Sequence, residues 1–235
     1  MELTKNHWKK EDISEFQTYL KQFENPAKRE WSTNLLRTKL PVLCLATPII
    51  KDIIKKISKG NYIEFLDLMI WEYYENTAIN GFLISMIKDF DLRKKYLDIY
   101  GSKADNWATC DLLTFDINGN EEKYFNLSLE YTKSEKPFVR RIGLYILFGF
   151  VDNDSYLDKI FNILNQFDHE EEYYVNMMAG WLLSECFIKQ RKKTLKYLEK
   201  SKLNKFALNK GIQKCRESRR VTPEDKDMLL QYKKK

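Results

Sequence analysis

Residues 47–57 have the sequence TPIIKDIIKKI, and this stretch decides the fold class. Thr47 precedes a proline at the first helical position, which is a common way for a helix to begin. The five isoleucines that follow recur at helical spacing, so they lie on one face of the predicted helix. The stretch therefore predicts an amphipathic helix that buries its isoleucine face against another element.

The same pattern recurs along the chain, and no run shows the strict alternation of a half-buried strand. With 8 glycines and 5 prolines in 235 residues, the chain has few residues for sharp turns, which favours helices. Further helices are expected at 61–74, 76–89, a segment opened by Ser102, 121–131, a segment capped by Ser134, 154–166, 170–188, 190–200, 204–217 and a short one from Thr222. The fold class that follows is all-α.

The spacing of these helices indicates how they pack. Every second helix begins near residues 48, 77, 103, 135, 171 and 205, at intervals of 29, 26, 32, 36 and 34. A compact orthogonal bundle could also bury them, but a period of roughly 30–45 residues is typical of helical-hairpin repeats. We expect residues 1–235 to form a single domain of HEAT-like repeats, a curved α-solenoid with a concave basic face and loosely ordered ends at 1–11 and 233–235.

Charge is unevenly distributed over this chain of net charge +6. Residues 188–220 contain thirteen Lys and Arg against two Glu, whereas residues 152–185 contain eight acids against one Lys. A solvated helical surface can produce such a bias, but a local excess of +11 also suits contact with a polyanion. The apolar content, 43%, excludes a disordered chain.

Four cysteines and two histidines leave little material for a metal site. No two cysteines are close in sequence, so a zinc site is not expected, and the cysteines are interpreted as buried, reduced side chains. The first ten residues are charged rather than apolar, and no apolar run is long enough to cross a bilayer. We therefore expect a cytoplasmic monomer that needs no cofactor or metal.

Four residues stand out once the repeat spacing is applied. Trp107 and Asp111 are four residues apart on one helix, Arg141 follows Trp107 by 34 residues, and Trp181 follows Arg141 by 40. Each alone is most often a packing tryptophan, a surface acid or a paired surface arginine. One repeat apart, they can line a continuous strip in which aromatic rings attract a cation, the carboxylate stabilises positive charge and the guanidinium binds phosphate.

These residues lie in segments that resemble a known family. Asn106-Trp107-Ala108-Thr109-Cys110-Asp111, Phe138-Val139-Arg140-Arg141 and Ala179-Gly180-Trp181-Leu182-Leu183 are similar to segments of the AlkD-type DNA glycosylases of the DNA alkylation repair family, which have a HEAT-like fold. Thr47-Pro48 with Lys51, and the basic region 208–218, extend the resemblance to about residues 12–217.

The resemblance implies the excision of N3- and N7-alkylated purines from double-stranded DNA. Asp111 would then stabilise the oxocarbenium-like sugar and position the attacking water, and Trp107 and Trp181 would pack beside the lesion nucleotide. Arg141 would hold the DNA backbone near the lesion. Contacts with other phosphates would come from Lys51, Arg140, Lys210 and Lys214. An alkylated purine is already cationic, so breaking its bond requires charge stabilisation and a water but no metal or cofactor.

The chain departs from the family pattern at its N-terminal end. The helix expected at 26–37 is shortened, residues 39–43 interrupt the helical pattern before Thr47, and Lys51 stands where active members carry Arg, which binds phosphate with two parallel hydrogen bonds. Asn176 and Met177 replace polar or basic positions, and the acidic run 168–172 is expected on the outer rim. Three functions therefore stay open: an alkylpurine glycosylase, a non-catalytic HEAT-like protein that binds DNA, and a protein–protein scaffold.

Overall fold

The computed structural model describes residues 1–235, and its regular elements are α-helices and short 3-10 helices, with no strand. The prediction of an all-α fold is confirmed. The chain divides into two compact units, Met1–Thr114 and Phe115–Lys235, which are described separately. No helix combines the length and the apolar character that crossing a membrane would require.

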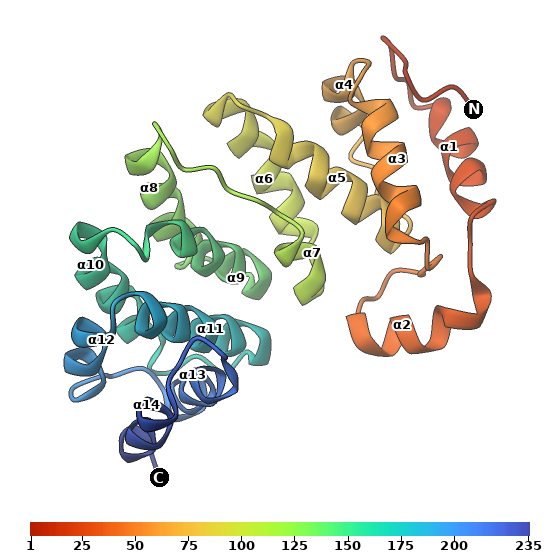
Figure 1. The fold of residues 1–235 in the computed structure, drawn as a ribbon. Coiled ribbons are helices and arrows are strands. Elements are labelled where there is room, and N and C mark those ends of the chain that lie inside the picture. The colour runs from red at the N-terminus through yellow and green to blue at the C-terminus, as the bar shows by residue number, and fades with distance from the viewer. The chain divides into compact units, whose positions relative to one another are not determined.

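The helices of both units are labelled in Figure 1. The α-helices of the first unit are α1 (Asp12–Lys21), α2 (Arg29–Leu36), α3 (Thr47–Ile57), α4 (Tyr62–Asp67), α5 (Tyr74–Met86), α6 (Phe90–Lys103) and α7 (Trp107–Asp111). Those of the second are α8 (Glu121–Tyr131), α9 (Pro137–Ile146), α10 (Asp154–Leu164), α11 (Tyr173–Lys189), α12 (Arg191–Leu198), α13 (Lys205–Glu217) and α14 (Pro223–Met228). The 3-10 helices are η1 (Pro26–Lys28), η2 (Leu147–Phe150), η3 (Asn165–Phe167) and η4 (Leu229–Tyr232).

In the first unit, α5 is the central helix and packs against α3, α4, α6 and α7. The isoleucine face of α3 points inward as expected, since Ile53, Ile54 and Ile57 are buried. Residues ahead of α1, expected to be a loosely ordered end, place Leu3 and Trp8 in the interior. The indole of Trp8 packs edge-on against Phe65, with 4.9 Å between ring centroids.

The region between residues 86 and 106 differs from the sequence-based prediction. We expected a helix at 76–89 followed by one opened by Ser102, and the separate helix α6 was missed. The helix α5 ends at Met86, and the Asp89 side chain accepts a hydrogen bond from the Leu92 amide, which starts α6. Ser102 lies in the last turn of α6, and the residue that caps α7 is Asn106.

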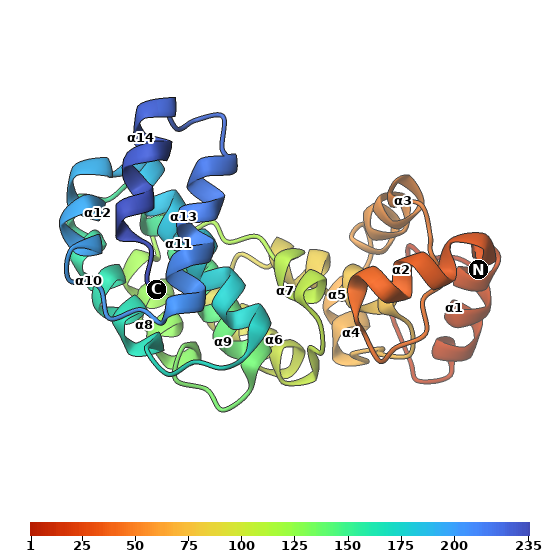
Figure 2. The ribbon, with the colours of Figure 1, turned by 90° about the horizontal axis from the view of Figure 1, so that it is seen from below.

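The second unit has two layers of helices. Figures 1 and 2 show α8, α10 and α12 on one side and α9, α11 and α13 on the other. Two glycines allow α11 and α13 to approach closely, because a Cβ at Gly180 would lie 2.8 Å from the Ala207 carbonyl oxygen and one at Gly211 would lie 2.8 Å from the Leu183 side chain. At the C-terminal end, expected to be loosely ordered, the Asn209 side chain exchanges two hydrogen bonds with the Lys234 backbone.

Candidate functional site

The short helix α7 carries Trp107 and Asp111 and is held rigidly by buried polar groups. The Asn106 side chain accepts a hydrogen bond from the Thr109 amide at 3.0 Å and donates one to the Thr109 hydroxyl at 2.8 Å. The Tyr100 hydroxyl donates to the Thr109 carbonyl at 2.9 Å. A helix of five residues gains little stability of its own, so these contacts fix the orientation of Trp107 and Asp111.

The end of α2 is attached to α7 through Asp105. The carboxylate of Asp105 accepts hydrogen bonds from the Thr38 hydroxyl at 3.0 Å and from the Lys39 amide at 2.6 Å. The indole nitrogen of Trp107 donates to the Leu35 carbonyl at 3.2 Å. That carbonyl belongs to the last turn of α2, where backbone acceptors lack a partner within the helix. The shortened N-terminal helix therefore sets the position of the Trp107 ring.

The Trp107 ring also has apolar neighbours. It packs, with Tyr74 and Cys44, against the buried side chains of Leu36 and Val42. The repeat spacing predicts Trp107 on a strip of residues that contacts a ligand. In the structure the Trp107 side chain is partly buried. Trp107 thus packs against this cluster and keeps part of its surface exposed.

The loop beside Trp107 depends on a buried carboxylate. Glu75, at the start of α5, is 2% exposed and accepts hydrogen bonds from the amides of Leu43, Cys44 and Leu45 at 3.0, 2.7 and 3.3 Å. Cys44 has φ of 62°, a left-handed conformation that is unusual for a residue with a side chain. Three amides converging on one carboxylate hold the loop in this conformation.

Tyr74 lies within electrostatic reach of Asp111. Burial, together with the negative charges of Glu75 and Asp111, raises the pKa of Tyr74 to about 12. The Tyr74 phenol is therefore neutral at physiological pH and close enough to Asp111 to sense its charge. Asp111 itself is half-buried, so its carboxylate is partly shielded from water.

A groove of about 740 Å³ opens next to this cluster in the first unit. Its walls come from α2, from the loop at residues 42–46 and from the first turn of α3, and it includes Tyr74 and Glu75. Trp31 and Leu35 line its rim and are 68% and 49% exposed. Exposed apolar groups beside a buried carboxylate suit a ligand with a flat apolar part.

In the second unit, Arg141 and Trp181 lie on the helices α9 and α11, which pack against each other. The guanidinium of Arg141 is buried and donates to the Tyr174 carbonyl at 2.6 Å. One turn along α9, the Tyr145 ring stacks on Trp181 with 6.3 Å between centroids and an angle of 26°, and Phe148 contacts Trp181 edge-on. Trp181 is half-buried and stays partly open to solvent.

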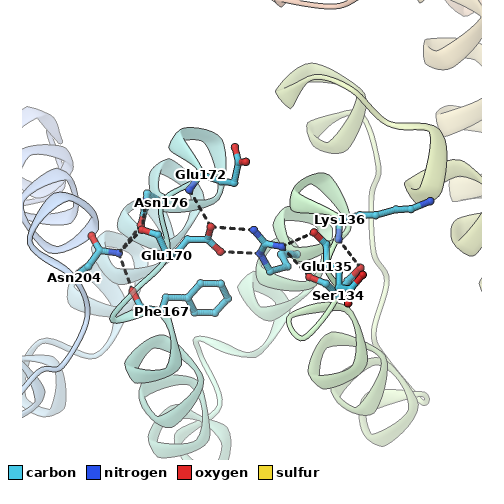
Figure 3. Close-up of polar contacts among 9 residues, drawn as sticks. Ser134, Glu135, Lys136, Phe167, Glu170, Glu172, Asn176 and Asn204 are labelled. Atoms are coloured by element: carbon cyan, nitrogen blue, oxygen red, sulfur yellow. Dashed lines mark hydrogen bonds and ion pairs between the residues drawn. The ribbon is translucent and has the colours of Figure 1, made fainter.

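Arg140 has a structural environment that the sequence did not predict. Its guanidinium binds both carboxylate oxygens of Glu170 at 2.7 and 2.9 Å and donates to the carbonyls of Ser134 and Glu135 at 2.8 and 3.0 Å. Figure 3 shows Glu170 directed toward Ser134 and Glu135, with Asn176 and Asn204 on its other side. Glu170 was expected on the outer rim with the rest of the acidic run, but its side chain is 9% exposed because it neutralises Arg140.

The remaining candidate cations are on the surface. Lys51 is exposed on α3, in the first unit. On α13, Lys210 lies over the Phe206 ring at 5.9 Å and binds Gln213, and Lys214 is half-buried one turn further along. The structure thus groups Trp107 and Asp111 in the first unit, and Arg141 and Trp181 in the second.

Three residues of the first unit escaped the sequence-based interpretation, namely Tyr74, Glu75 and Asp105. Only one signal was available: Tyr74 and Glu75 begin a segment, YENTAIN, with several polar residues inside an apolar helix pattern. Polar residues that interrupt an apolar pattern are often buried and hydrogen-bonded.

The chain matches one known protein family. The family described as DNA alkylation repair enzyme matches residues 16–215, most of the chain. No curated protein matches the chain.

Proposed function

Since the chain belongs to the DNA alkylation repair enzyme family, we propose that it is a DNA glycosylase that hydrolyses the N-glycosidic bond of N3- or N7-alkylated purines in duplex DNA. The observation that carries this proposal is the placement of Asp111 on the helix α7, which buried hydrogen bonds hold, within electrostatic reach of the neutral Tyr74 phenol. Preorganised charge of this kind stabilises the positive charge that develops on the sugar as the base leaves.

Each residue of the cluster has a separate role in the proposed reaction. The carboxylate of Asp111 stabilises the oxocarbenium-like sugar and accepts a proton from the attacking water. The exposed part of the Trp107 ring attracts the cationic nucleotide, and the neutral Tyr74 phenol adds no charge of its own to the site. The purine leaves as a neutral base because it carried the formal positive charge from the start.

DNA binding is proposed to depend on cations of both units. The amino groups of Lys51, Lys210 and Lys214 contact phosphates, and the exposed part of Trp181 packs beside the lesion nucleotide. Arg141 is 4% exposed and donates to the Tyr174 carbonyl, so it positions α11 instead of contacting the DNA backbone itself. Arg140 has a positioning role in this proposal, because its donors are taken up by Glu170 and two carbonyls. Phosphate contacts predict that binding weakens steeply with added salt.

The test compares the wild-type protein with the Asp111→Asn variant in single-turnover base release from duplexes containing N7-methylguanine or N3-methyladenine. We expect the substitution to slow release by about 10²-fold or more, because a charge directed at the transition state is lost. Affinity for the same duplex in a gel-shift assay is expected to change by less than about twofold, since a neutral amide replaces a group that does not bind phosphate.

The matched control is Asp227→Asn, which removes the same charge from an exposed position in the second unit. Equal release by wild type and Asp111→Asn would refute the role of Asp111. No release by the wild-type protein, with salt-sensitive DNA binding intact, would instead identify a non-catalytic DNA-binding member of the family.

A further inference from the structure

The basic stretch 188–220 does not form one surface. Its cations on α13 belong to the same layer as α9 and α11, whereas those on α12 belong to the layer of α8 and α10 (Figures 1 and 2). The residues proposed above to contact DNA in this unit are all on α11 and α13. The cations of α12 are therefore left without a role.

Two of these cations, with two lysines from the segment that follows α12, line a groove of about 710 Å³ between α10 and α12. Four lysines line it, and Asp158 is the single acid among its lining residues. The four lysines are Lys193, Lys196, Lys200 and Lys202. Beneath them, the rings of Phe161 and Tyr197 stack in parallel, 4.3 Å apart and inclined by 5°, and both are buried. The groove thus has a rigid base and a cationic rim.

Most of this positive charge is not neutralised within the protein. Lys193 forms an ion pair with Asp154 at 2.6 Å. The amino groups of Lys196, Lys200 and Lys202 have no hydrogen-bond or ion-pair partner. Ammonium groups held near one another repel, and an anion that binds among them relieves this repulsion.

The groove also offers an oriented amide. The side-chain oxygen of Asn165 accepts hydrogen bonds from the Tyr197 hydroxyl at 3.1 Å and from the Lys202 amide at 2.9 Å. This fixes the oxygen toward the protein and leaves the amide nitrogen as a donor. Lysines with a donor amide are the groups that proteins commonly use to contact phosphate oxygens.

We propose that the groove between α10 and α12 binds the phosphate backbone of a second DNA duplex, separate from the one that carries the lesion. None of the exposed large apolar side chains of the chain lies on α10 or α12, so the surface lacks groups for stacking on unpaired bases or entering a membrane. The inference rests on the family's link to DNA and does not require glycosylase activity.

The test counts duplexes bound per protein chain. Sedimentation velocity with a fluorescent, unmodified 16-base-pair duplex at low salt is expected to give complexes of two duplexes with one wild-type chain. The affinity for the second duplex should fall as salt is added. A plot of the logarithm of the binding constant against the logarithm of the salt concentration should have a slope of up to about −3.6, since each of the four lysines contributes about −0.9. The variant with Lys196→Gln, Lys200→Gln and Lys202→Gln is expected to stop at one duplex.

Two matched variants complete the design. The control with Lys10→Gln, Lys59→Gln and Lys88→Gln removes the same charge from exposed positions of the first unit and should still bind two duplexes. The variant with Lys196→Arg, Lys200→Arg and Lys202→Arg keeps the charge and should bind two as well. Circular dichroism of every variant verifies that the helices are retained.

Three results would overturn the proposal. In the first, the wild-type protein saturates at one duplex and the groove variant binds that duplex equally well. In the second, the groove variant still binds two duplexes. In the third, the wild-type protein floats with anionic vesicles, and the groove variant loses this flotation while its duplex count is unchanged. Binding of a single duplex that is lost only in the groove variant would also overturn the proposal, because the groove would then hold the one bound duplex and not a second. Base release is measured separately, so failure of the glycosylase proposal does not affect this readout.

Discussion

Replacing Glu75 tests whether one buried carboxylate organises the loop beside Trp107. In the folded protein this carboxylate accepts three backbone amides, and two of those amides belong to the buried residues Leu43 and Leu45. The third belongs to the half-buried Cys44, so water can replace the lost partner there. The perturbation is the pair of substitutions Glu75→Ala and Glu75→Gln.

The magnitude follows from the amides that lose their acceptor. A buried polar group left without a partner costs about 1–3 kcal/mol, so two orphaned amides in Glu75→Ala lower the free energy of unfolding by about 4 kcal/mol. In Glu75→Gln one oxygen remains as an acceptor and one buried amide is orphaned, which lowers the free energy of unfolding by about 2 kcal/mol. The neighbouring Glu72→Gln, at an exposed position, should change it by less than about 0.5 kcal/mol.

Urea unfolding followed by tryptophan fluorescence provides the measurement. Four of the five tryptophans, at positions 8, 31, 71 and 107, belong to the first unit, so the signal reports mainly on that unit. With a slope near 2 kcal/mol per molar urea, Glu75→Gln should lower the midpoint by about 1 M. A midpoint for Glu75→Ala within about 0.25 M of wild type would refute the reasoning, because it would show that the loop does not depend on this carboxylate.

Two further predictions concern the second unit and the thiols. Arg140→Gln leaves Glu170 buried without a counter-charge, so it should lower the free energy of unfolding by about 3 kcal/mol. Urea titrations followed by circular dichroism measure this change, and the control Lys133→Gln should have little effect. A loss of DNA affinity without a loss of stability would contradict the positioning role of Arg140. Burial raises the pKa of Cys215 to about 12 and also raises the pKa of Cys186, and the Cys110 side chain is fully buried. Ellman's reagent at pH 8 should therefore react rapidly only with the half-buried Cys44. The Cys44→Ala variant should then lose the rapid phase, and a second rapid thiol would contradict the observed burial.

Local patterns in the sequence predicted the helices with regular apolar spacing. The helix α3 begins and ends where the TPIIKDIIKKI stretch predicts, because its five isoleucines and its proline act within the same few turns. The sequence also predicted helix starts at Asn61 and Thr222. The structure confirms both, because each side chain accepts a hydrogen bond from the backbone amide three residues further along. The helix α6 was missed because charged residues such as Asp91, Arg93 and Lys94 interrupt its apolar pattern.

The all-α fold, its helical repeats and the family were thus accessible from the sequence alone, since helix formation and motif spacing depend on residues near one another along the chain. The partners of the polar groups were decided only by the tertiary structure. Asp105 binds Thr38 and Lys39 across 66 or 67 residues, and Arg140 binds Glu170 across 30. The basic stretch likewise divides between two layers only when α12 and α13 pack in different places. A charge selects its partner by distance in space, and packing of helices far apart in sequence sets that distance.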